Sequence, residues 1–358
     1  MTKEQEFILS LIRTFLTEEC DTFPNGNVQW KQVMELSTRH GVQGICFDAL
    51  GLLAAEQRPD KTTLLEWLGK VVCVEHFYEK QKMAIDSLSD FYLQNGIKMM
   101  LLKGFGMSLY WPKPNHRPGG DIDIYLGAFW QQADRMVSEK LGIKVDDGHE
   151  HHTCFNYYGM MVENHYDFLN TKVNESAREL EKIIKNLATF DIPLKIERGV
   201  IYLPSATLNV IFLLRHLGQH FAGAEATLRQ VLDWAFFMQH ESNNIDWNFV
   251  LPILKRSGIY RFFQQINAIC VDYLGFSERL FPEIKREPDL ETRIICDIMS
   301  PEFGEKKPEG NTFRVIYYKT MRFIANRWKR NVVFREGLVS QFLYGSIAHI
   351  RRYRTIKD

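Results

Sequence analysis

The chain has 358 residues, of which 45% are hydrophobic and 25% are charged, a composition that is ordinary for a soluble globular protein. Lys and Arg total 44, and so do Asp and Glu, so the overall charge gives no indication of a nucleic-acid or membrane partner. The length is sufficient for two or three units with sizeable hydrophobic cores.

The cysteines indicate neither a zinc knuckle nor a disulfide framework, because no Cys-x-x-Cys pair occurs. They are scattered along the chain at Cys20, Cys46, Cys73, Cys154, Cys270 and Cys296. The N-terminus lacks a signal-peptide pattern, and no apolar run approaches the roughly 18 residues that a membrane span needs. We therefore expect a cytoplasmic protein in a reducing compartment, without a membrane partner.

Residues 1 to 95 are predicted to be helical. Phe7, Leu11 and Phe15 recur at the spacing of one helix face. Residues 62 to 94 mix aromatic and charged side chains at helical spacing. We interpret this first region as a helical cap, or as a partner-binding surface, for the part of the chain that follows.

Residues 96 to 203 are predicted to form a mixed α/β core, because segments with strand-like and helix-like periodicity alternate here. The expected elements are a strand before Lys103, a strand at Asp123, a helix over 129–141, a hairpin over 151–168, a helix over 175–187 and an edge strand within 192–203.

The most informative stretch is Gly119-Gly120-Asp121-Ile122-Asp123-Ile124, which places two carboxylates two residues apart after a pair of glycines. Alternate side chains of a strand share a face, so we expect Asp121 and Asp123 to point together as exposed ligands, with Ile122 and Ile124 buried on the other face. The glycines allow a tight turn and leave room for a phosphate near the backbone. Two such carboxylates favour a divalent cation such as Mg²⁺, as phosphoryl and nucleotidyl transfer require.

A second informative stretch covers residues 96 to 107. It is predicted to be a buried strand that continues through Lys103-Gly104 into a turn and a short helix. A strand, a turn and a helix N-terminus present backbone N–H groups to an anion. This stretch is therefore a candidate phosphate-binding element.

Four segments resemble, in their order and spacing, the uncharacterised bacterial nucleotidyltransferase family of the DNA polymerase β superfamily: Leu101-Leu102-Lys103-Gly104, Tyr110-Trp111-Pro112-Lys113-Pro114, Arg117 and Gly120-Asp121-Ile122-Asp123-Ile124. This match is much more specific than an isolated Asp-x-Asp pair. The resemblance implies an α+β fold with a small mixed sheet in residues 96–203, flanked by helical regions at 1–95 and 204–358. It also implies an NTP such as ATP as substrate and Mg²⁺ as cofactor.

The resemblance further implies a third carboxylate on a later strand, in an acidic-x-His pattern that Glu163-Asn164-His165 fits. Residues 151–157 and 162–168 flank Tyr158-Gly159 and are predicted to form a β-hairpin. Alternation along the second strand places Glu163, His165 and Asp167 on one face. We take Glu163 as the third carboxylate, with Asp167 as the fallback.

The predicted site has two sets of residues. The catalytic residues and metal ligands are Asp121, Asp123 and Glu163, and the nucleotide- or phosphate-binding residues are Lys103, Gly104, Arg117 and Gly120. The superfamily generally has Gly followed by Gly or Ser in its first motif, whereas this chain has Lys103-Gly104-Phe105. A Lys103 side chain that points into the site would neutralise a phosphate, and one that points away would put nucleotide binding in doubt. Lys103 and Arg117 could also be surface cations.

Two groups of histidines invite a metal-binding interpretation that we do not favour. Adjacent residues of His149-Glu150-His151-His152 point to opposite faces of a strand, and no suitably spaced Cys or Asp completes a tetrahedral set. His216 and His220 are four residues apart, as zinc ligands on a helix are, but the segment lacks the Glu of His-Glu-x-x-His. We expect His216 and His220 to pack or hydrogen-bond against the catalytic core.

Residues 204 to 358 are predicted to form a helical domain with a basic end. The helices resemble those that follow the core in the same family, which bear histidines and an Arg-x-x-x-Asp pair, here Arg229 and Asp233. From Asn311 to Asp358 there are 11 Lys and Arg against 2 Asp and Glu, a net charge of +9. A nucleic-acid arm is one interpretation of this charge. We favour an ordinary basic helical surface, because such charge is most often solvated or locally paired.

The leading hypothesis is a Mg²⁺-dependent nucleotidyltransferase that moves a nucleoside monophosphate from an NTP to a hydroxyl group of an acceptor: a small molecule, a protein side chain or an RNA end. Asp121, Asp123 and Glu163 would hold two metal ions, which in such enzymes lie roughly 3.5–4 Å apart. Lys103 and Arg117 would steady the pyrophosphate that leaves. The alternative is a non-catalytic or regulatory nucleotide-binding protein, including one component of a toxin–antitoxin pair.

Overall fold

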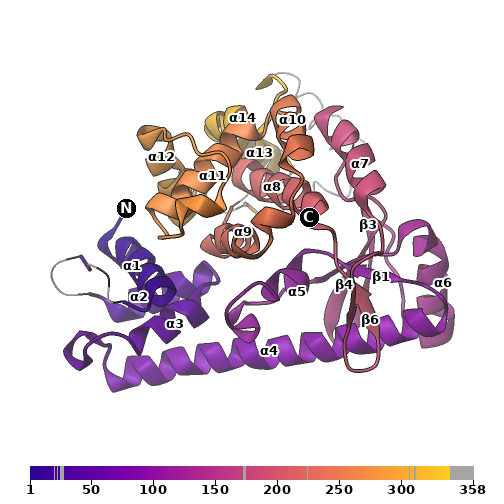
Figure 1. Ribbon diagram of the computed structural model, residues 1–358, viewed down its shortest axis with the longest axis horizontal. Coiled ribbons are helices and arrows are strands. Elements are labelled where there is room, and N and C mark those ends of the chain that lie inside the picture. Colours follow the sequence, from indigo (N-terminus) through magenta and orange to yellow (C-terminus); the bar gives the residue numbers. More distant parts are fainter. Residues whose placement is uncertain are drawn as a thin grey trace.

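The fold contains a mixed six-stranded sheet, with helices before and after it in the chain (Figure 1). The structure is a computed structural model, and it describes residues 1–19, 21, 23–24, 28–171, 175–223, 225–305, 307–309 and 312–338. Within these residues there are fourteen α-helices and six strands. The α+β fold class and the small mixed sheet predicted from the sequence are confirmed.

The N-terminal region is helical, as predicted, and comprises α1 (Lys3–Thr17), α2 (Trp30–Arg39), α3 (Gln43–Leu50) and α4 (Lys61–Gln94). Helix α1 begins at a capping box, in which the side chains of Thr2 and Gln5 each accept from the other's backbone amide. The Asp60 carboxylate caps α4 by accepting from two backbone amides. Helix α4 runs below α1–α3 at one end and below the sheet at the other (Figure 1).

The sheet has the strand order β3-β4-β2-β1-β6-β5. The strands are β1 (Met99–Leu101), β2 (Ile122–Tyr125), β3 (His152–Tyr157), β4 (Met160–His165), β5 (Pro193–Lys195) and β6 (Val200–Tyr202). Strands β2 and β4 pair in parallel, as do β1 and β6, and the other neighbours are antiparallel. The parallel pairing of β2 with β4 aligns Asp123 with Glu163.

The predicted hairpin between β3 and β4 is confirmed, with Tyr158 and Gly159 between the two strands. Both turn residues have positive φ, 51° and 77°, as a type I′ turn requires. The register places His152 opposite His165 and Cys154 opposite Glu163. Residues directly opposite each other share a face of the sheet, so these four side chains lie on one face.

Residues 192–203 form a hairpin of two strands rather than the single edge strand predicted from the sequence. Strand β5 is the edge strand and begins with Pro193, whereas β6 is internal, between β1 and β5. The turn between them forms because the Asp86 carboxylate of α4 accepts from the amides of Arg198 and Gly199 at 2.8 and 3.1 Å. This partner lies 112 residues before Arg198, so the local pattern does not reveal the turn.

The two faces of the sheet are in different environments. One face packs on α4 and on α6 (Trp130–Leu141), with Ile122, Ile124 and Val162 in the apolar core between them. The burial predicted for the two isoleucines is therefore confirmed. The opposite face carries the polar side chains that converge toward the C-terminal helices.

Helices that follow β4 in the chain form a layer on the side of the molecule away from α4 (Figure 1). The helices after β4 are α7 (Glu175–Leu187), α8 (Ala206–Gly223), α9 (Leu228–Glu241), α10 (Trp247–Ser257), α11 (Tyr260–Asp272), α12 (Pro288–Met299), α13 (Thr312–Ala325) and α14 (Arg327–Val333). The Gln5 side chain and the His40 ring both donate to the Met299 carbonyl, each at 3.3 Å, so the N-terminal helices contact this layer. One apolar cluster draws on all three predicted regions, and their division into domains stays a prediction.

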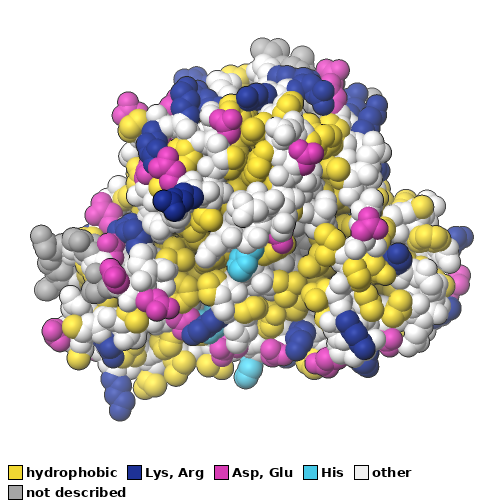
Figure 2. Space-filling view, viewed as in Figure 1, with side chains coloured by type: hydrophobic (Ala, Val, Ile, Leu, Met, Phe, Trp, Pro, Cys, Tyr) yellow, Lys and Arg dark blue, Asp and Glu magenta, His cyan; other side chains and the backbone are white. Residues whose placement is uncertain are grey.

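Acidic and basic side chains are interspersed on the face of the molecule drawn in Figure 2. The basic C-terminal stretch is described only in part, because it includes α13 and α14 whereas Arg351–Asp358 lies outside the described residues. The ordinary basic helical surface stays the prediction for this stretch, and the nucleic-acid arm stays the alternative. No described helix combines the length and the apolar character that a membrane crossing needs.

Candidate active site

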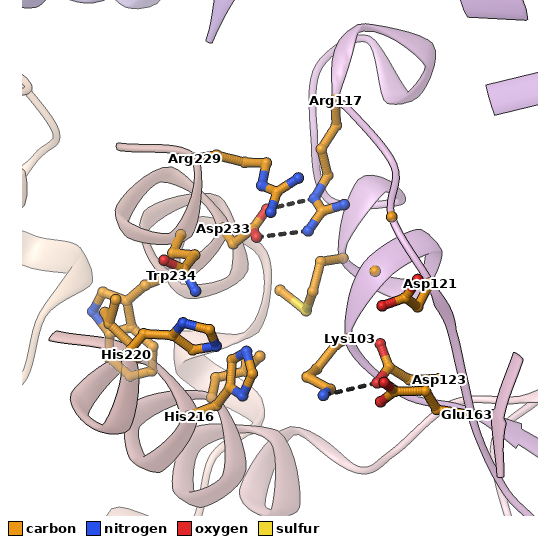
Figure 3. A pocket seen from close by; sticks show the side chains of 16 residues that line it. Lys103, Arg117, Asp121, Asp123, Glu163, His216, His220, Arg229, Asp233 and Trp234 are labelled. Atoms are coloured by element: carbon orange, nitrogen blue, oxygen red, sulfur yellow. Dashed lines mark hydrogen bonds and ion pairs between the residues drawn. The ribbon is translucent and has the colours of Figure 1, made fainter. Parts of the chain in front are cut away.

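A pocket of about 360 Å³ lies between the sheet and helices α8 and α9 (Figure 3). This volume is in the range of small-molecule sites, roughly 300–1,000 Å³. The wall contains all seven residues of the predicted site, Lys103, Gly104, Arg117, Gly120, Asp121, Asp123 and Glu163. It also contains nine residues outside the predicted site, Met107, Leu213, His216, Leu217, His220, Arg229, Gln230, Asp233 and Trp234.

The three carboxylates come from two neighbouring parallel strands. Asp121 immediately precedes β2, Asp123 lies within β2, and Glu163 lies at the β4 position that pairs with Asp123. Paired positions of neighbouring strands share a face. Figure 3 shows the three side chains together on the sheet wall of the pocket.

Asp123 is buried, which differs from the exposed position expected for a metal ligand in this motif; 8% of the residue is exposed. Its Oδ1 accepts from Lys103 Nζ at 2.8 Å and from His165 Nε2 at 3.0 Å. Burial raises the pKa of Asp123, but Lys103 and His165 outweigh burial, and the pKa lies well below its ordinary value. Asp123 is therefore held ionised by partners from α5 (Lys103–Ser108) and β4.

Asp121 is exposed, as expected, and its electrostatic environment is the opposite of that of Asp123. Burial raises the pKa of Asp121, and the charges of Glu163 and Asp123 raise it further, against a smaller opposing effect of Lys103. Negative charge is thus in excess around Asp121. A cation bound between these carboxylates would relieve their repulsion.

Lys103 and Gly104 together form the part of the wall that follows β1. The Lys103 side chain points into the pocket, where its Nζ also lies 5.6 Å from the centre of the Phe212 ring. Gly104 has φ 39° and ψ −115°, and a Cβ there would lie 3.2 Å from the Asp121 carbonyl oxygen. A glycine is therefore needed for the close approach of this turn to the segment that carries Asp121.

His165 is a site residue that the prediction left out. Its Nε2 lies 3.0 Å from Asp123 Oδ1 and 3.3 Å from Glu163 Oε2, so one ring connects two carboxylates. Burial lowers the pKa of His165, but the hydrogen bonds to Asp123 and Glu163 outweigh burial and raise it. Its position two residues after Glu163 on one strand could have identified it. Asp167, the fallback carboxylate, does not line the pocket and forms an ion pair with Lys185.

Arg117 is buried rather than on the surface, and it connects the two walls of the pocket. Its Nε and Nη2 donate to the two carboxylate oxygens of Asp233, on α9, at 2.7 and 2.8 Å. Arg229 also lines the pocket, but it donates to the Pro118 carbonyl at 2.9 Å. The two residues of the Arg-x-x-x-Asp pair therefore both face the site, and the ion-pair partner of Asp233 is Arg117.

The α8 histidines face the α/β core across the pocket, which agrees with the packing role predicted for them. His216 and His220 line the pocket, with ring centroids 4.5 Å apart. Burial lowers the pKa of both, and the nearby Lys103 ammonium lowers it further. Both rings are therefore neutral at neutral pH and add polar, uncharged surface to the helical wall.

Comparison with known proteins agrees with this geometry. A family model described as an uncharacterised nucleotidyltransferase matches residues 26–275, a range that contains every residue of the pocket wall. No curated protein and no solved structure matches the chain. The match covers more than half of the chain, and the chain therefore belongs to this family of uncharacterised nucleotidyltransferases.

Proposed function

We propose that the chain transfers a nucleoside monophosphate from an NTP to an acceptor hydroxyl, as a Mg²⁺-dependent, cytoplasmic member of the DNA polymerase β-like superfamily. The observation that carries the proposal is the convergence of Asp121, Asp123 and Glu163 on one wall of a pocket that Lys103, Arg117 and Arg229 also line. The family match supports nucleotidyl transfer as the type of reaction. ATP is the first nucleotide to test.

The donor set fits Mg²⁺. This ion prefers carboxylate oxygens and keeps several of its waters. The exposed Asp121 and the half-buried Glu163 supply such oxygens and leave room for the waters. Lys103 Nζ, 2.8 Å from Asp123 Oδ1, supplies the positive charge that a metal ion would supply beside that carboxylate. Another cation at Asp123 would leave Lys103 available to a phosphate.

The charges of the pocket favour a metal-bound triphosphate over a free one. Four carboxylates line the wall, those of Asp121, Asp123, Glu163 and Asp233, against the three cationic side chains of Lys103, Arg117 and Arg229. A triphosphate is itself strongly anionic, so the sheet wall repels it unless a cation lies between them. Bound Mg²⁺ would offset part of the negative charge of the triphosphate and would stabilise the attacking and leaving oxygens.

The side chains then divide into three roles. Burial raises the pKa of Glu163, but its hydrogen bond with His165 outweighs burial, so Glu163 is ionised at neutral pH and can accept the proton of the acceptor hydroxyl. Lys103 and Arg229 would hold the phosphates that leave. Arg117 acts mainly as a positioning residue, because Asp233 occupies its Nε and Nη2.

The test is transfer of label from an NTP that carries it in the α-phosphate. The purified chain is incubated with each of the four NTPs, Mg²⁺ and separate pools of aminoglycosides and sugars, of proteins and of RNA. Label in one pool, with matching pyrophosphate release that Asp121→Asn abolishes, is the expected result. NTP binding without pyrophosphate release in any pool would favour the regulatory alternative.

A further inference from the structure

A group of metal-type donors lies on the same sheet, beside the pocket but not in its wall. One ring nitrogen of His149, one ring nitrogen of His152 and the Cys154 sulfur lie within 4.8 Å of one another. None of these three residues lines the pocket, and the proposed transfer does not use them. Two imidazoles and a thiol also differ in chemistry from the three carboxylates, because they favour zinc and similar ions over Mg²⁺.

The fold brings these donors together, although the sequence separates them. His152 and Cys154 are two residues apart on β3, so their side chains share the face that carries Glu163. The chain that leads to His149 is held against this strand, because the backbones of Asp146 and Cys154 exchange hydrogen bonds of 2.7 and 2.8 Å. The rings of His149 and His152 stack with centroids 4.6 Å apart. Cys154 thus completes a donor set that the histidine run alone does not complete.

The surroundings of His152 suit a metal ligand. The residue is 7% exposed, and its Nδ1 has no hydrogen-bond partner among the described residues. A buried polar nitrogen without a partner costs free energy, which a bound cation would offset. Burial lowers the pKa of His152 to about 4, so the ring is neutral at neutral pH, and neutral imidazole is the form that binds metal ions.

We propose that His149, His152 and Cys154 bind a divalent cation of the zinc class, with water or the Asp146 carboxylate as the fourth ligand. Bonds of about 2.0–2.3 Å in a tetrahedron separate the ligand atoms by roughly 3.4–3.6 Å, so donors that lie within 4.8 Å of one another need to approach by at most about 1.4 Å. His149 permits this movement because it is exposed and precedes the strand. Burial and the nearby Glu163 charge raise the pKa of Cys154 to about 12, so binding replaces the S–H bond with a metal–sulfur bond and releases the proton to solvent.

The cation would act on the transfer site through His152. A zinc-bound histidine commonly donates its other N–H to a carboxylate, which orients both groups. His152 Nε2 lies 3.7 Å from Glu163 Oε1, slightly longer than a hydrogen bond. The bound cation would therefore orient Glu163, although the site itself does not rest on the proposed nucleotidyl transfer.

The experiment uses Co²⁺ as a coloured substitute for Zn²⁺, with the full chain under argon in thiol-free buffer. A near-ultraviolet thiolate-to-cobalt band, together with visible bands of tetrahedral intensity, is the expected result, and Zn²⁺ should remove both. Cys154→Ser should lose the near-ultraviolet band. Cys73→Ser removes an exposed thiol on α4 and is the matched control, so it should keep the band. Asp121→Asn should also keep it, which separates this site from the Mg²⁺ site.

His149→Ala keeps the experiment decisive if Cys154→Ser folds poorly, because His149 is exposed. It should weaken Co²⁺ and Zn²⁺ binding by at least about tenfold. The absence of a thiolate band in the wild-type chain would overturn the proposal, as would its persistence in a folded Cys154→Ser variant. Loss of binding in His151→Ala, but not in His149→Ala, would place the cation with His151, His152 and His165 instead, and our assignment would be wrong.

Discussion

Different interactions hold each of the two walls of the pocket in place. On the sheet wall, Asp123 and Glu163 occupy paired positions of two strands, so backbone hydrogen bonds fix their spacing. On the helical wall, α8 and α9 present their side chains through apolar packing and through the ion pair between Asp233 and Arg117. One wall is rigid by backbone pairing, whereas the other depends on contacts between distant parts of the chain.

This difference separates the functions that each wall can perform. Metal ligands need fixed oxygen positions, which a pair of strands supplies. A substrate-binding wall needs a shape and a charge that complement the substrate. Helices such as α8 and α9 can supply both. We therefore expect substitutions on the sheet wall to lower turnover, and substitutions on the helical wall to lower affinity and stability.

The largest effect is expected at the Asp-x-Asp pair. Asp121→Asn and Asp123→Asn should each lower transfer by about 10³-fold or more, because each removes a charge that stabilises the transition state. The melting temperatures of the two variants should differ. Asp121→Asn relieves like-charge repulsion and should melt at the same temperature or higher, whereas Asp123→Asn removes the negative charge beside the half-buried Lys103 and the buried His165 and should melt lower.

The measurement is label transfer together with differential scanning calorimetry on both variants. Retained activity with a large loss of stability in Asp121→Asn would show that the pair is structural. Equal melting temperatures for the two variants would contradict the different environments assigned to the two carboxylates.

The sheet wall was largely predictable because short segments encode most of it. Alternation along β2 places Asp123 on one face and Ile122 and Ile124 on the other. The two residues Tyr158 and Gly159 set the hairpin that carries Glu163. The parallel pairing of β2 with β4 joins segments about 40 residues apart and was not predicted. Resemblance to a family supplied only the expectation of a third carboxylate on a later strand.

The ion pair of the helical wall and the burial of Asp123 could not be predicted in this way. Asp233 and Arg117 are 116 residues apart, and nothing in either segment specifies the other. Asp123 is buried because Lys103 and His165 approach it from other elements. The Asp-x-Asp motif alone predicts an exposed metal ligand at this position. Local periodicity assigns a face to a side chain, and only tertiary packing decides what covers that face.

A second test on the sheet wall compares Glu163 with its neighbour Asp167. Glu163→Gln should lower the transfer rate by about 10²–10⁴-fold with a modest change in NTP affinity, because a general base acts mainly in the transition state. Asp167→Asn should change the rate little, since Asp167 pairs with Lys185 outside the pocket. Single-turnover kinetics at saturating NTP measures both. The reverse pattern would move the third carboxylate to Asp167.

On the helical wall, Asp233→Ala should act through stability and affinity. Removing one partner of a buried ion pair leaves the other charge uncompensated, which costs about 3–5 kcal/mol. The side chains of Arg117 and Asp233 are 6% and 10% exposed, so this range applies. Urea unfolding should show the loss, and the KM for NTP should rise while kcat falls less.

Asp272→Ala is the matched control for Asp233→Ala. Asp272 also accepts two bonds from one arginine, Arg286, at 3.0 and 3.2 Å, but this pair is exposed. Exposed ion pairs contribute little to stability, so this variant should unfold like the wild type. Similar losses in the two variants would show that the Arg117 pair does not connect the walls.

A fourth test removes the metal. NTP affinity should fall by about 100-fold when EDTA replaces Mg²⁺, because the carboxylates repel the triphosphate unless a cation intervenes. Asp121→Asn serves as the control, since it lacks one ligand and should respond less to Mg²⁺. Calorimetric titration with ATP in both buffers measures the difference. Equal affinity in the two buffers would contradict the metal-binding assignment of the sheet wall.

The smallest effect concerns the N-terminal helices that support the helical wall, where the His40 carbonyl accepts from the Arg229 amide at 3.1 Å. Burial lowers the pKa of His40 to about 4, against an ordinary value near 6.5. Between these values the unfolded chain binds a proton that the folded chain does not, so this residue lowers stability as pH falls from 6.5 to 4 and has no such effect above pH 6.5. From pH 7.5 to 4.5 the wild type should therefore lose about 2 kcal/mol more unfolding free energy than His40→Gln, whose amide can still donate to Met299. Urea unfolding of both proteins at the two pH values measures the difference. Equal losses would show that His40 is protonated in the folded protein at pH 4.5. They would also show that the burial of His40 does not limit the stability of the helical wall at low pH.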